Sequence, residues 1–160
     1  MNTREQIFLY LVLIIVLFMV WGKIDWVVYQ RPDIEPASYN FGYIQVPSYW
    51  FWMWLIHVPL TSLLVMLAFW IGAPDTDQNN LTALGLFLTI LLFWMGGLED
   101  VFYFVLNGQP FPAGEWIWFK GTTVYWAIFG TWNTPLHFLW LGFFCFLVFL
   151  TWAVIDYYEG

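Results

Sequence analysis

Two adjacent acids, Glu99 and Asp100, stand in the middle of the apolar stretch "FWMGGLEDVFYFVL". An ionised carboxylate is costly to bury in hydrocarbon, so a pair of them requires a positive partner, a proton or a functional use. A third acid, Asp25, lies in "GKIDWVVY", and the two histidines of the chain are His57 and His137, also in apolar surroundings. These five residues are the candidates for chemistry.

Carboxylates and neutral imidazoles that project from facing helices are the ligands of zinc, or of iron and manganese in carboxylate-bridged pairs. The sequence therefore predicts a divalent metal site, either Zn, Fe or Mn, formed by His57, His137, Glu99, Asp100 and Asp25. The spacing matches neither Glu-x-x-His nor His-x-x-x-His, so ligation would depend on tertiary proximity. Without a metal, one acid of the pair could act as a general acid and a histidine as the base, which makes Glu99, Asp100, His57 and His137 candidate catalytic residues.

Two further interpretations stay open for the same residues. A protonated acid paired with histidine or amide could form a hydrogen-bonded network that only fixes helix packing. A haem b with His57 and His137 as axial ligands is a lesser alternative, because it leaves three acids at the same level unexplained.

The composition identifies the environment of these residues. Of 160 residues, 62% are hydrophobic and only 9% are charged, and the mean hydropathy is +0.71, which is typical of an integral membrane protein. The net charge of -7, with only four lysines and arginines, lacks the basic surface of a nucleic-acid-binding protein. We therefore expect no nucleic-acid partner.

Four segments are long enough to cross about 30 Å of hydrocarbon as helices. They cover residues 7–29, 49–72, 81–107 and 132–157. We predict an all-α, polytopic membrane protein in which residues 1–160 form a single four-transmembrane-helix bundle. The two long connections are rich in tryptophan and tyrosine, so we expect them in the interfacial region, and the positive-inside rule favours a cytoplasmic position for them.

The two halves of the chain share a pattern. Each has a helix with an acid near its C-terminal end, a proline-containing aromatic loop, and a helix with a histidine near its N-terminal end. This pattern is compatible with a tandem repeat of two-helix units. At 1.5 Å rise per residue all five candidate residues lie at similar depth on the side of the long loops, and we expect His57, His137 and at least one of Glu99 or Asp100 to converge.

Each candidate residue also has a polar neighbour at helical spacing. These supporting residues are Tyr29, Thr61, Tyr103, Asn107 and Asn133. Adjacent residues diverge by about 100° on a helix, so the paired acids must have different roles. We favour Glu99 as the primary group, steadied by Tyr103, and place Asp100 against a neighbouring helix or the aromatic loops.

The stretch "LEDVFYFVL" resembles the acidic pair followed by aromatic residues in membrane-bound carotenoid cyclases. The similarity covers only these residues, and the loops, the helix count and the histidines follow a different pattern. The resemblance implies one kind of chemistry for intramembrane acids, which is the protonation of an apolar olefin.

The leading functional hypothesis is an enzyme that acts on a membrane lipid or another apolar small molecule by metal-assisted or acid–base chemistry. The alternative, from a different class, is a non-catalytic small subunit of a membrane complex or a proton- or ion-conducting protein. In that case the polar residues carry protons or bind partner helices, in a homo-oligomer or a larger membrane complex.

Overall fold

The computed structural model describes residues 3–29, 38–41, 44–47, 53–72, 78–116 and 129–159. Within these residues, three helices are long and apolar enough to cross a membrane, and a bent pair supplies a fourth crossing if the pair is one span. The helices are α1 (Thr3–Tyr29), α3 (Val58–Gly72) with the π-helical turn η1 (Met53–His57) before it, the bent pair α4 (Gln78–Met95) and α5 (Leu98–Leu106), and α7 (Thr134–Glu159). Helices of this length and composition are consistent with a membrane protein, as the composition predicted.

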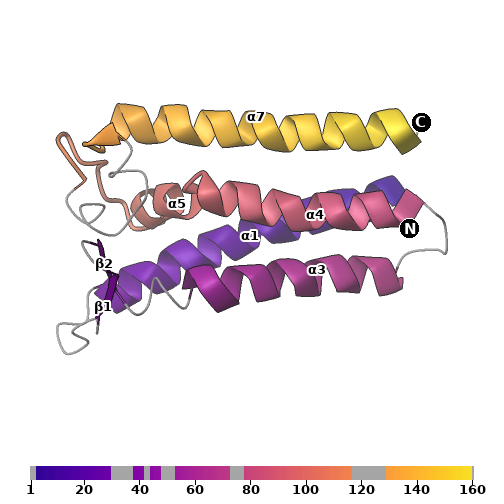
Figure 1. Cartoon of the computed structure of the whole chain (residues 1–160), viewed down its shortest axis with the longest axis horizontal. Coiled ribbons are helices and arrows are strands. Elements are labelled where there is room, and N and C mark those ends of the chain that lie inside the picture. The colour runs from indigo at the N-terminus through magenta and orange to yellow at the C-terminus, as the bar shows by residue number, and fades with distance from the viewer. Residues whose placement is uncertain are drawn as a thin grey trace.

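The bent pair α4 and α5 lies between α7 on one side and α3 on the other, and α1 crosses the bent pair (Figure 1). The main packed pairs are α3 with α4, α4 with α7, and α1 with α5. A compact bundle would also bring α7 against α1 or α3, and a tandem repeat would pair the first two spans in the way that α4 pairs with α7. Neither the predicted four-helix bundle nor the predicted repeat is therefore confirmed.

The third span differs from the straight helix expected over residues 81–107. It breaks at Gly96 and Gly97, and α4 and α5 meet at a bend of 64°. Gly97 has φ 74° and ψ 31°, the left-handed conformation that a side chain disfavours and that ends a helix. The adjacent acids thus lie in the first turn of a new helix, α5, rather than inside a continuous one.

Aromatic rings and one glycine hold α1 against the broken span. The rings of Phe18 and Trp21 meet edge to face at 5.1 Å, and Trp21 meets Trp94 of α4 at 5.5 Å. Further along α1, a Cβ on Gly22 would lie 2.7 Å from the backbone nitrogen of Tyr103. The backbones of α1 and α5 therefore touch at Gly22, which is the close approach that small residues permit between membrane helices.

The described parts of the two long connections lie at the same end of the molecule (Figure 1). The first contains an antiparallel hairpin of β1 (Ser38–Phe41) and β2 (Ile44–Pro47), which the all-α prediction did not include. In the second, Glu115 pairs with Asn133 as an isolated bridge, and the backbone nitrogen of Trp116 donates to the carbonyl of Trp132 at 2.8 Å. The described part of this connection is therefore joined to the start of α7.

Candidate functional site

Three carboxyl groups meet where α5 packs on α1. Asp25 and Glu99 are each only 2% exposed, and their carboxyl groups are hydrogen-bonded to each other. Asp100 is partly buried and lies within electrostatic range of both. The bend after Gly97 produces this arrangement, because it restarts the helix with the two acids in its first turn, where backbone N–H groups also favour negative charge.

The hydrogen bond between Asp25 and Glu99 fixes the minimum proton content of the site. An ionised carboxylate only accepts hydrogen bonds, so two carboxyl groups can bond to each other only if one carries a proton. Glu99 Oε1 is buried and has no hydrogen-bond partner among the described residues. The site thus holds a shared proton on one side of Glu99 and an accepting oxygen on the other.

Polar residues of α5 extend the site towards the long-loop end. Tyr103 lies within electrostatic range of all three acids, and its ring packs on Trp26 with centroids 5.4 Å apart. The side chain of Asn107 donates to the carbonyl of Tyr103 at 2.7 Å and accepts a hydrogen bond from Lys23 Nζ. Lys23 therefore joins the end of α1 to the end of α5. Of the two predicted supporting residues here, Tyr103 lies beside the acids, and Asn107 contacts the backbone of Tyr103 at the end of α5.

His137 is buried beside the break and uses both ring nitrogens. Trp132 Nε1 donates to His137 Nδ1 at 3.3 Å, and His137 Nε2 lies 3.1 Å from the carbonyl oxygen of Gly97. Because an indole N–H can only donate, Nδ1 must accept, which leaves the ring proton on Nε2 to donate to Gly97. The ring of Trp116 stacks on the imidazole at 4.3 Å. His137 is thus a neutral histidine held in one tautomer.

A second side chain of α7 also donates a hydrogen bond to the break. Trp140 Nε1 donates to the carbonyl oxygen of Met95 at 2.8 Å. Carbonyls released by a helix break inside a membrane need donors from neighbouring helices, and His137 and Trp140 supply them. Asn133, predicted as a partner of His137, supports it by capping α7, since its Oδ1 accepts from the backbone nitrogen of Leu136 at 3.0 Å.

The other predicted histidine does not share this environment. His57 ends η1, is exposed, and has its ring 6.5 Å from that of Trp21. Thr61 follows one turn later and is partly buried, while the side chain of Tyr29 lies outside the described part of the chain. The described residues therefore place His137 beside the acids through Gly97 but show no convergence of both histidines.

The described residues show no arrangement for the predicted metal ion and do not test the predicted haem. No group of three or more His, Cys, Asp or Glu side chains among them is arranged to hold a metal ion. Each nitrogen of His137 is already in a hydrogen bond, so an ion would have to displace Trp132 or Gly97. The metal site built from His57, His137, Glu99, Asp100 and Asp25, like the bis-histidine haem, stays a prediction of the sequence.

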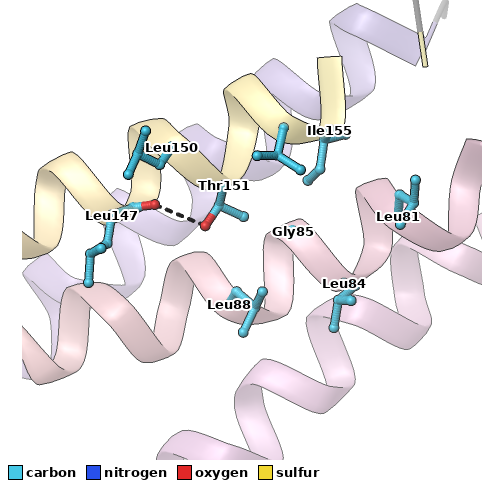
Figure 2. Close-up of a pocket in the computed structure, with 9 residues that line it drawn as sticks. Leu81, Leu84, Gly85, Leu88, Leu147, Leu150, Thr151 and Ile155 are labelled. Carbon is cyan, nitrogen blue, oxygen red and sulfur yellow. Dashed lines mark hydrogen bonds between the residues drawn. The ribbon is translucent and has the colours of Figure 1, made fainter. Parts of the chain in front are cut away.

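An apolar groove of about 370 Å³ lies between α4 and α7, away from the acids (Figure 2). Its lining includes Leu81, Leu84, Leu88, Leu147, Leu150 and Val154. The one hydroxyl in it, of Thr151, donates to the carbonyl of Leu147 at 2.9 Å. Leu88 precedes the break by eight residues, or about 12 Å of helix, so the groove does not open onto the carboxyl groups.

Sequence reading missed the residues that form the break and its supports, namely Gly22, Gly97, Trp116, Trp132 and Trp140. The adjacent glycines of "WMGGLED" were the available signal for the break, because two glycines in an apolar run favour a change of direction. A comparison of the chain with known proteins finds no matching family model, curated protein or solved structure.

Proposed function

We propose that this chain is a proton-conducting membrane protein whose centre is the carboxyl site of Asp25, Glu99 and Asp100. The observation that carries the proposal is the hydrogen bond between two buried carboxyl groups, because that bond exists only while a proton is shared between them. Ionisable residues at membrane depth are the usual components of proton pathways.

The geometry provides a transfer step and a route for its reversal. A proton on Glu99 can cross the hydrogen bond to Asp25, so that the O–H bond of Glu99 breaks, an O–H bond of Asp25 forms and Glu99 is left as the carboxylate. The step is reversed when the proton returns across the same hydrogen bond, so that the O–H bond of Asp25 breaks and that of Glu99 forms again. The unpaired Oε1 of Glu99 is the oxygen through which the pair can exchange this proton with a neighbouring group. Tyr103 and Asp100 lie within electrostatic range of this oxygen's carboxyl group and are the next polar groups along the helix.

The apolar groove between α4 and α7 gives no support to the enzymatic hypothesis. An enzyme that protonates a lipid must bring its substrate to the acid within hydrogen-bond distance. The groove lies along the far part of α4, whereas the acids lie beyond the break and against α1. A centre that exchanges only protons needs no such cavity.

Proton flux in liposomes tests the proposal. The purified chain, reconstituted with an entrapped pH-sensitive dye, is expected to dissipate an imposed pH gradient faster than protein-free liposomes. Glu99→Gln and Asp25→Asn should each reduce the flux to the protein-free level, because an amide cannot exchange the shared proton. Glu115→Gln is the matched control, since Glu115 is an exposed acid whose Oε1 accepts a hydrogen bond from the hydroxyl of Thr131 at 2.9 Å.

Two results would contradict the proposal. Wild-type protein that dissipates the gradient no faster than protein-free liposomes does not conduct protons. Flux that survives Glu99→Gln as well as it survives Glu115→Gln would place the pathway elsewhere.

A further inference from the structure

We infer that His137 is a positioning residue for the carboxyl site, and that with Trp140 it makes α7 the element that holds Glu99 against Asp25. The inference rests on the proposed proton-transfer function. It identifies how the carboxyl site is regulated, namely by the hydrogen bonds from α7 to the break between α4 and α5.

At the break between α4 and α5, two backbone carbonyl groups are hydrogen-bonded to α7. Gly96 and Gly97 still donate their N–H groups back to Leu92 and Trp94, at 2.8 and 3.0 Å, so the chain folds into a tight turn there. The carbonyls of Met95 and Gly97 instead accept hydrogen bonds from α7 side chains. These two bonds connect α7 directly to the turn from which α5 starts.

The His137 side chain, which donates to Gly97, is held rigidly by its neighbours. The imidazole of His137 is stacked on Trp116 and receives a hydrogen bond from Trp132, so both the plane and the tautomer of the ring are fixed. Trp116 is itself anchored, because its Nε1 donates to Thr134 Oγ1 at 2.9 Å, and that hydroxyl donates to the carbonyl of Pro112 at 2.6 Å. A histidine built into such a network directs its Nε2–H to one place.

Gly97 connects His137 to the acids. Gly97 precedes Glu99 by two residues and is the N-cap of α5, so the position of its carbonyl sets the position of the first turn. A Cβ on Gly97 would lie 2.5 Å from His137 Cε1 and 3.1 Å from Asp100 Oδ2. The start of α5 is therefore confined between His137 on one side and the backbone contact at Gly22 of α1 on the other. Release on the His137 side would let Glu99 move away from Asp25.

The test compares donors at the break with a matched donor elsewhere. His137→Phe keeps an aromatic ring to stack on Trp116 but removes the Nε2–H, and Trp140→Phe removes the second donor. The control is Trp152→Phe, because Trp152 Nε1 also donates from α7 to α4, at 3.0 Å to Thr89 Oγ1, but far from the break. His137→Gln is the conservative variant that keeps an N–H donor.

Two measurements are made on each reconstituted variant: hydrogen exchange of the α5 backbone amides and proton flux. We expect His137→Phe and Trp140→Phe to speed exchange of the first α5 turn by up to about tenfold, the effect of losing one hydrogen bond, and to lower the flux. Trp152→Phe should change neither, and His137→Gln should lie closer to the wild type than His137→Phe. If His137→Phe does not fold, Trp140→Phe still tests whether hydrogen bonds from α7 hold the break in place.

Each outcome separates the inference from the proposed function. If Glu99→Gln abolishes flux while both break variants behave as Trp152→Phe does, proton conduction stands and the positioning role of His137 is wrong. If His137→Phe speeds exchange in α5 without lowering flux, the contact is structural only and the inference is wrong. If wild-type protein carries no protons, the proposed function fails and this inference fails with it.

Discussion

Replacing Gly22 with alanine is expected to lower the free energy of unfolding by about 1–3 kcal/mol, the usual cost of overpacking a close interface. The added methyl group would lie 2.7 Å from the backbone nitrogen of Tyr103 and 2.9 Å from the carbonyl oxygen of Glu99. Both atoms belong to the backbone of α5, so no side-chain rotation can make room and the two helices must separate. Unfolding in mixed detergent micelles, followed by tryptophan fluorescence, measures the effect.

The matched control for this substitution is Gly142→Ala in α7. Gly142 is exposed within a helix, and apart from its chain neighbours and the adjacent backbone of α7, no atom of the described residues lies within 4 Å of a Cβ placed there. Alanine should stabilise the helix at that position by about 0.5–1 kcal/mol relative to glycine. If Gly22→Ala were as stable as Gly142→Ala, the contact between the backbones of α1 and α5 would not exist.

Gly97→Ala is expected to have the larger effect on stability, about 2–5 kcal/mol, because two costs add. Alanine at φ 74° is strained, and its methyl group would lie 2.5 Å from the ring of His137. The ring cannot turn aside without losing the hydrogen bond from Trp132. The substitution should also lower proton flux, since it displaces the first turn of α5.

Gly108→Ala separates the two costs. Gly108 also has a positive φ, 62°, but apart from its two chain neighbours, no atom of the described residues lies within 4 Å of its Cβ position. The backbone strain alone should cost about 1–2 kcal/mol there. Equal losses at Gly97 and Gly108 in the same unfolding experiment would mean that His137 does not lie against the break.

The sequence predicts the parts of this fold that depend on composition and length. Runs of about 20 apolar residues identify the spans, and the structure confirms helices within all four predicted segments. The acids are conspicuous in the sequence for a similar reason, because an acid in an apolar run stands out from its neighbours alone. The expected difference in role between Glu99 and Asp100 stays a prediction, which the deeper burial of Glu99 favours.

What the sequence does not predict depends on contacts between distant segments. The bend at Gly97 is stabilised by His137, forty residues later, because its ring donates to the Gly97 carbonyl. The same ring occupies the space that a side chain at Gly97 would need. The two histidines look alike in sequence, yet one is exposed and the other is enclosed by tryptophans from a loop. Helical periodicity carries no information on either point, because it describes one helix at a time.

Infrared difference spectroscopy of the reconstituted protein tests the central claim most directly, because it detects a proton on a carboxyl group without relying on flux. At the pH at which the liposomes conduct, the wild type should show the carbonyl stretching band of a protonated carboxylic acid, shifted on exchange into D₂O. The band should keep its position in Glu115→Gln but shift or lose intensity in Glu99→Gln, where the hydrogen bond between the two carboxyl groups is gone. A spectrum without that band, or a band that Glu99→Gln leaves unchanged, would show that Asp25 and Glu99 do not share a proton.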